Sequence, residues 1–174
     1  MLPRSWLRLA GVLLLLGFTC GCLGGERGTT YHNRSYGCSF IVPAGWEYEE
    51  PREREGVLTL KIAETNGRSS YMVVTVFPAE LYSREEAVDE AEKLLQNSLY
   101  ALEGSVQRQE YRLSSGESGP LLRASAGKKE KIGAAAAVLY GSRFHALAAL
   151  ISAAEDYGSC EEAFQTLLDT LQLK

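Results

Sequence analysis

The sequence predicts an α+β fold with a single antiparallel sheet of about six or seven strands, flanked by helices on both faces. Three observations lead to this prediction. Short runs rich in β-branched and alternating apolar residues recur over residues 38–77 and 106–151. Two segments with helical periodicity follow these blocks. The Ala-rich runs "IGAAAAVLY" and "FHALAALI" hardly alternate, which is typical of strands covered on both faces.

The first block contains three predicted strands. The run "CSFIVP" ends at Pro43, "VLTLKIAE" places alternate apolar residues on one face, and "YMVVTVF" is followed by Pro78. The segment from Glu47 to Glu55 carries five glutamates, so we expect an exposed loop there.

The next element is a helix over residues 83–102. Ser83 and Glu86 have the spacing of a capping box, apolar residues recur every three or four positions, and Gly104 ends the pattern. A second capping box, Ser159 with Glu162, predicts that the final helix begins at Ser159.

Four more strands are predicted between the two helices. They cover residues 106–111, 120–126, 131–140 and 143–151, and Gly141-Ser142 forms a two-residue hairpin turn between the last two. Without its tertiary context, the Ala-rich stretch could also be helical.

The first 22 residues have the pattern of a secretory signal peptide. Arg4 and Arg8 precede an apolar core of about ten residues, whereas a membrane-spanning helix needs roughly 20. Gly21 places a small side chain before Cys22, so we expect the signal to be removed up to Cys22.

The residues Phe18 to Cys22 resemble the lipobox of bacterial lipoproteins, although Thr19 stands where a leucine is usual. The resemblance implies a diacylglycerol on the sulfur of Cys22 and stable anchoring to a membrane by two or three acyl chains. Leu23, rather than Asp, follows the cysteine, which favours the periplasmic face of the outer membrane over the inner membrane. A plain secreted protein or a short membrane segment is the alternative.

The rest of the chain divides into a tether and one domain. Residues 23–35 are rich in Gly, Thr, Asn and Ser and are expected to be flexible, and residues 36–174 form a single domain. Without Arg4 and Arg8, 16 basic residues face 22 acidic ones. This acidic balance argues against nucleic acid as a partner.

The run "YGCSFIVPAGWE" resembles the opening of the PsbP-like domains, a group that includes extrinsic photosystem proteins, bacterial DcrB-like lipoproteins and Ran-binding nuclear import factors. The capped helix, the hairpin at Gly141 and the closing helix "EEAFQTLLDTLQL" extend the resemblance over residues 36–173. It implies a sheet with helices on both sides and a non-catalytic assembly or binding role. No photosystem or Ran-binding surface is matched residue by residue.

No catalytic, cofactor-binding or metal-binding residues are predicted. His32 lies in the tether, and His145 has no ligand-type neighbour in the sequence, so a satisfied structural histidine is expected. The run "SSGESG" lacks the spacing of a nucleophile elbow. Arg52 and Arg54 interrupt the glutamates of residues 47–55, which favours a solvated face over a calcium site.

Trp46 has two possible roles. It either caps the core after the turn at Pro43, which we favour, or it forms a ligand-binding aromatic patch with Tyr48 and Tyr71.

Cys38 and Cys160 are the two cysteines left after processing and lipidation, and an exported domain meets oxidising conditions. They form either a disulfide or two separate buried thiols.

The sequence therefore predicts a lipid-anchored cell-envelope protein that binds or assembles with an unknown envelope protein, without catalysis. An envelope hydrolase or a small-ligand carrier with an unrecognised site is the alternative.

Overall fold

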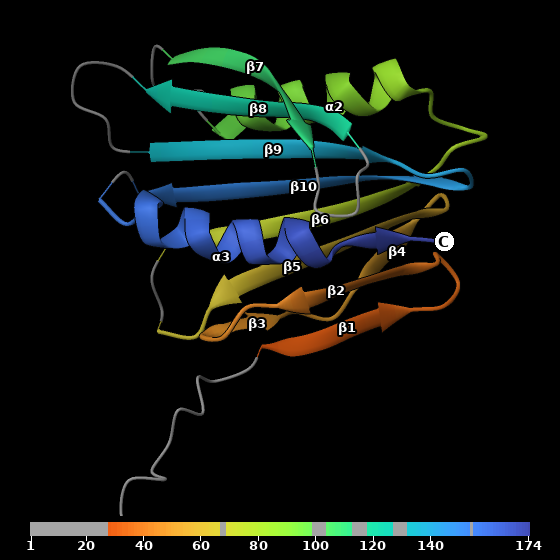
Figure 1. Cartoon of the computed structure of the whole chain (residues 1–174), viewed down its shortest axis with the longest axis horizontal. Helices are drawn as coiled ribbons and strands as arrows, with labels where there is room; N and C mark the ends of the chain where they lie inside the picture. The colour runs from red at the N-terminus through yellow and green to blue at the C-terminus, as the bar shows by residue number, and fades with distance from the viewer. Residues whose placement is uncertain (1–27, 67–68, 99–103, 113–117, 127–131, 154) are drawn as a thin grey trace, which may run out of the picture.

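A computed structural model describes residues 28–66, 69–98, 104–112, 118–126, 132–153 and 155–174. Within these residues the chain forms an eight-stranded sheet, a three-stranded sheet and two helices (Figure 1). The large sheet contains β3 (Trp46–Tyr48), β4 (Arg52–Arg54), β5 (Val57–Glu64), β6 (Tyr71–Pro78), β7 (Gly104–Arg112), β8 (Ser118–Ala126), β9 (Ile132–Tyr140) and β10 (Phe144–Ala153). The other elements are β1 (Thr29–Asn33), β2 (Cys38–Val42), β11 (Gln172–Leu173), α2 (Arg84–Ser98) and α3 (Tyr157–Thr170).

The strand order of the large sheet is β3-β5-β6-β10-β9-β8-β7, with β4 paired to the end of β5. All of these pairs are antiparallel. The small sheet has the order β1-β2-β11, so the C-terminal strand returns to pair near the beginning of the fold.

The core consists of two layers, one on each face of the large sheet. On one face, buried residues of β8, β9 and β10 pack against α2. On the other face, the small sheet and α3 together cover the apolar side chains of β5, β6, β9 and β10.

The Ala-rich strand β9 is buried on both faces, as its composition predicts. Ala134 and Ala136 belong to the layer under α2, and Ala135 and Ala137 belong to the layer under α3. Alternate alanines therefore let a helix approach the same strand from each side.

The predicted fold class is wrong. The molecule is mostly β, and it is not a single sheet sandwiched between helices, because three strands form a second sheet that shares one face with α3. On the other face α2 packs mainly over β9 and β10 and reaches β7 and β8, which leaves β5 and β6 beside it.

Two segments expected to be irregular are strands. Thr29–Asn33, expected in the tether, pairs with β2 as β1. The glutamate-rich segment contains β3 and β4, both paired with β5, although most of its side chains are exposed. Glu55 and Gly56 link β4 to β5 with φ angles of 54° and 77°, the conformation of a two-residue hairpin turn.

The helix ends were predicted with mixed success. Glu86 accepts a hydrogen bond from the Ser83 N–H at 2.7 Å, and the Glu86 N–H donates to Ser83 Oγ at 3.2 Å, which confirms the first capping box. The second is wrong: α3 begins at Tyr157, and Ser159 Oγ instead donates to the carbonyl oxygen of Asp156. The hairpin at Gly141 is confirmed, but the predicted two-residue turn is wrong, because the loop covers residues 141–143.

Candidate functional site: a groove beside helix α2

The register of four neighbouring strands builds one row of side chains on the face that carries α2. Leu147 in β10 lies opposite Thr75 in β6, Thr75 lies opposite Thr59 in β5, and Thr59 lies opposite Arg52 in β4. Leu147 is buried near α2, the two threonines are half-buried, and Arg52 is exposed. The row thus leads from the covered half of the sheet to its open half.

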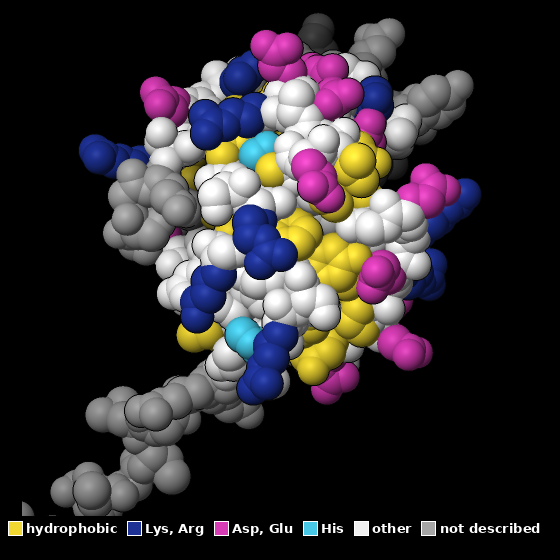
Figure 2. Space-filling view, turned by 90° about the vertical axis from the view of Figure 1, so that its right-hand side faces the viewer, with side chains coloured by type: hydrophobic (Ala, Val, Ile, Leu, Met, Phe, Trp, Pro, Cys, Tyr) yellow, Lys and Arg dark blue, Asp and Glu magenta, His cyan; other side chains and the backbone are white. Residues whose placement is uncertain are grey.

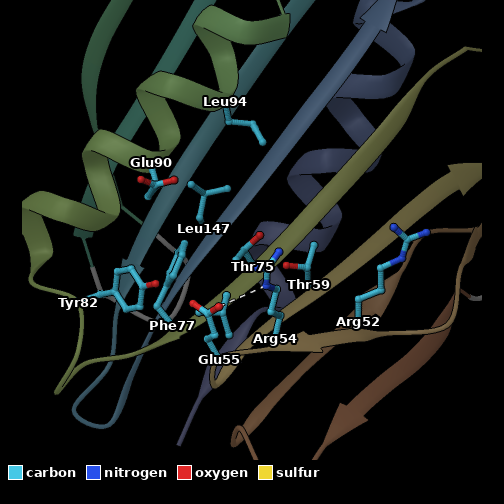
Figure 3. A pocket seen from close by; sticks show the side chains of 11 residues that line it. Arg52, Arg54, Glu55, Thr59, Thr75, Phe77, Tyr82, Glu90, Leu94 and Leu147 are labelled. Carbon is cyan, nitrogen blue, oxygen red and sulfur yellow. Dashed lines mark ion pairs between the residues drawn. The ribbon is translucent and has the colours of Figure 1, made fainter.

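This open half forms the floor of a groove of about 520 Å³ (Figure 3). The groove has α2 on one side and the β4 hairpin on the other. Its lining residues are Arg52, Arg54, Glu55, Val57, Thr59, Thr75, Phe77, Tyr82, Glu90, Leu94 and Leu147.

Helix α2 forms the first wall of the groove. The residues that border the groove lie next to the buried apolar residues of the helix. Ala91 and Leu95 are completely buried against the sheet, whereas Glu90 and Leu94 are half-buried and border the groove. Helical periodicity explains this division, because residues one position apart point about 100° away from each other.

Strand β4 forms the second wall, and the alternation of its side chains makes this wall basic. Arg52 and Arg54 point to the groove, whereas Glu53, which lies opposite Leu58 in the register, points to the opposite face, near the Tyr36 hydroxyl. Burial and this contact raise the pKa of Tyr36 to about 12.

The charges along the groove are only partly paired. Arg54 lies 3.4 Å from Glu55, and Glu90 lies 2.7 Å from Lys93, which raises the pKa of Lys93. Among the described residues, Arg52 makes no ion pair. Exposed ion pairs contribute little stability, so these arginines can exchange partners at small cost.

The loop from β6 to α2 adds an apolar rim at one end of the groove. Tyr82 lines the groove, its ring centroid lies 5.0 Å from that of Phe77, and the neighbouring Leu81 is 62% exposed. The loop projects at the right of Figure 1, and Figure 2 shows hydrophobic side chains reaching the surface at that end of the molecule.

A second polar group lies near the start of α2. The Arg84 guanidinium carbon is 4.8 Å from the centre of the Tyr140 ring, and the His145 ring meets Tyr140 edge-on at 5.5 Å. His145 is buried, as expected, and its Nδ1 atom has no hydrogen-bond partner in the described part of the chain. Burial, followed by the charge of Arg84, lowers the pKa of His145.

The two cysteines are free and buried, so of the two alternatives left open by the sequence the structure does not form the disulfide. Cys38 pairs with Leu173, beyond the C-terminal end of α3, whereas Cys160 lies in the first turn of that helix. From Cys160 to Thr170 the helix rises about 15 Å, roughly twice the Cα separation that a disulfide tolerates. The alternative of two separate buried thiols agrees with this arrangement.

Trp46 is buried, as predicted, and the alternative aromatic patch does not form. Trp46 packs in the layer shared by α3 and the small sheet, and Tyr48 on the same face contacts Tyr31 with ring centroids 5.3 Å apart. Tyr71 packs in the layer on the opposite face of the large sheet.

No group of three His, Cys, Asp or Glu side chains that could hold a metal ion occurs within the described ranges. Within the same ranges, no helix has both the length and the apolar character needed to cross a membrane. The expected signal peptide, Cys22 and most of the "SSGESG" run lie outside the described residues.

The groove was not predicted from the sequence, in which Arg52 and Arg54 were expected only to interrupt a solvated acidic segment. The alternation Arg52-Glu53-Arg54 before a Glu-Gly turn is a signal for a short hairpin strand with both arginines on one face. Which face that would be depends on pairing with β5 and could not be derived locally.

Comparison with known proteins identifies the fold. The solution structure of cyanobacterial PsbP (CyanoP) from Synechocystis sp. PCC 6803 matches with a TM-score of 0.63 at 15% identity, covering 90% of this chain and 98% of that one. The fold is PsbP-like. A structure of a Mog1 variant matches with a TM-score of 0.54 at 11% identity, over 84% of this chain and 95% of Mog1. No family model matches the sequence, and the search of curated proteins finds no match.

Proposed function

We propose that this PsbP-like protein is a lipid-anchored, non-catalytic binding or assembly module of the cell envelope, and that it holds a protein partner in the groove beside α2. The observation that carries the proposal is the open half of the sheet face, where the half-buried floor lies between α2 and the basic strand β4. The resemblance to PsbP-like domains supports a binding role.

The shape of the groove favours a segment of protein over a small molecule. Small-molecule sites are usually concave and bury most of the ligand surface. Here the groove is bordered by the exposed residues Arg52, Arg54 and Glu55, and its rim continues into the exposed Leu81. A groove with such an exposed border suits a partner that continues beyond it.

Anchoring through Cys22 would leave this surface accessible. Residues 23–27 lie between Cys22 and the described part of the chain. In Figure 1 the β6–α2 loop lies at the upper right of the molecule and the beginning of β1 lies at its lower edge. An anchor before β1 would therefore hold the rim at Leu81 away from the bilayer.

The proposal is tested by site-specific photo-cross-linking in cells of the native host. A photoreactive amino acid at Thr75, on the groove floor, is expected to capture a protein partner, and the same group at the exposed Glu162 of α3 is not. Leu94→Asp should abolish capture from Thr75 because it places a charge at the groove wall. Capture at Glu162 alone, or no protein captured from Thr75, would contradict the proposal.

A further inference from the structure

We propose that the partner enters the groove as an amphipathic helix that lies alongside α2 and turns acidic side chains toward Arg52 and Arg54. This inference rests on the proposed function of the groove as a protein-binding site. Three separate observations support it: the spacing of the strands, the pairing of their backbones and the charges along the groove.

The spacing of the strands leaves room for one more helix. Neighbouring strands are about 4.8 Å apart, and packed helices lie 8–10 Å from each other. Helix α2 packs mainly over β9 and β10, and β6 is the next strand after β10. A second helix beside α2 would therefore lie over β6, where Val73 and Thr75 are half-buried.

The backbone of the floor excludes an added strand. An extended peptide binds a sheet through unpaired N–H and C=O groups at an edge strand. Strand β6 is paired with β5 and β10 on its two sides, and β5 is paired with β6 on one side and with β3 and β4 on the other. Neither floor strand offers a free edge, and in the described residues the three-residue strand β4 is paired only with β5. An occupant that lies over the floor therefore cannot pair with it, which favours a segment that satisfies its own backbone, as a helix does.

The charges of the groove indicate which side of the bound helix carries acidic side chains. The molecule has a net charge of −4, so an acidic segment is repelled by most of its surface. Strand β4 is a local exception, because Arg52 and Arg54 face the groove and Glu53 faces away. On the opposite wall Glu90 is already paired with Lys93. Acidic side chains on the β4 side of the occupant complement this pattern.

The cross-linked positions on the partner distinguish a helix from other occupants. Val73 and Thr75 are separated by about 6.6 Å along β6, which corresponds to about four residues of a helix but two residues of a strand. With photoreactive groups placed at Val73 and Thr75 in separate variants of the full chain, mass spectrometry should locate partner sites three or four residues apart. Sites two residues apart, or scattered over distant segments, would overturn the helix while leaving the groove as a protein-binding site. Failure to capture any protein from both positions would overturn the proposed function as well.

Charge reversal tests the orientation of the helix. Arg52→Glu together with Arg54→Glu should reduce capture from Thr75 about tenfold, and Arg34→Glu in the exposed turn after β1 serves as the matched control with unchanged capture. All three arginines are exposed, so the thermal midpoint of each variant should equal that of the native chain. Equal capture by the double variant and the control would overturn the proposal that acidic side chains of the partner face Arg52 and Arg54. Capture of lipid instead of protein would overturn both proposals.

Discussion

At the scale of single residues, buried polar groups determine how the protein responds to pH and to oxidation. His145, Cys38 and Cys160 are buried in the two layers of the core, and none of them belongs to the groove. Their chemistry therefore reports on folding and not on binding.

His145 predicts a loss of stability on mild acidification. Burial and Arg84 hold the pKa of His145 below its usual value of 6.5. The unfolded chain therefore binds a proton at higher pH than the folded chain does, and the free energy of unfolding falls as the pH drops from about 6.5 through the folded pKa. His145→Gln should show a smaller fall between pH 7.5 and pH 5 in urea unfolding. His32→Gln, at an exposed position, is the control and should behave like the native chain. If the free energy of unfolding depends on pH equally in both variants, His145 is not the cause of the loss of stability.

The cysteines predict two inert thiols. Burial raises the pKa of Cys38 to about 12, so little thiolate exists at neutral pH. Cys160 is also buried, and its sulfur accepts a hydrogen bond from Ser152 Oγ at 3.4 Å. We expect the mature, lipidated protein to show no thiol reaction when folded and two reactive thiols after denaturation without reductant. If no reactive thiol is found after denaturation, Cys38 and Cys160 form a disulfide and this prediction is wrong.

At the scale of elements, two adjacent leucines of helix α2 have different expected roles, one in the stability of the fold and the other in binding the partner. Leu95 is completely buried against the sheet, and Leu94 borders the groove. Leu95→Ala should lower the free energy of unfolding by about 2–5 kcal/mol, because it leaves a cavity in the core. Leu94→Ala should lower it by less and should reduce partner capture from Thr75. Chemical denaturation measures the first effect, and similar losses of stability in both variants would argue that Leu94 also belongs to the core.

The elements that were predicted correctly are those with strong local signals. The Ser83–Glu86 capping box gave the start of α2, and the apolar runs gave β2, β5, β6 and β7 to β10. The short strands β3 and β4 were missed because three-residue strands carry too few residues for a pattern, and glutamates favour loops. The small sheet was missed because the pairing of β11 with β2 joins residues more than 130 positions apart.

At the scale of the whole molecule, the groove and the proposed lipid anchor differ in how much they depend on the fold. The groove could not have been predicted from the sequence, because its floor, its two walls and its rim come from β4, β5, β6, β10 and α2, and their juxtaposition depends on strand order. The proposed lipobox, in contrast, is contained within residues 18–22 and can be tested without the structure.

Lipidation predicts different outcomes for the two N-terminal cysteines. Cys22→Ala should leave unprocessed precursor or protein released from membranes, because the acylated sulfur is lost. Cys20→Ala should change neither processing nor membrane partitioning, because Cys20 is removed with the signal peptide. Fractionation and intact-mass measurement check both variants. If Cys22→Ala is still cut at the same bond and still partitions with membranes, the protein is not a lipoprotein.

The alanines of β9 have a consequence for how this protein can evolve. Each of Ala134, Ala135, Ala136 and Ala137 is almost completely buried, with core side chains packed over both faces of the strand. A larger side chain there overpacks the core at a cost of typically 1–3 kcal/mol, so we expect substitutions at these positions to be rare. The half-buried and exposed positions of β4, β5 and β6 tolerate exchange. Lineages that acquire new partners should therefore diverge in one half of the sheet while the other half remains almost invariant.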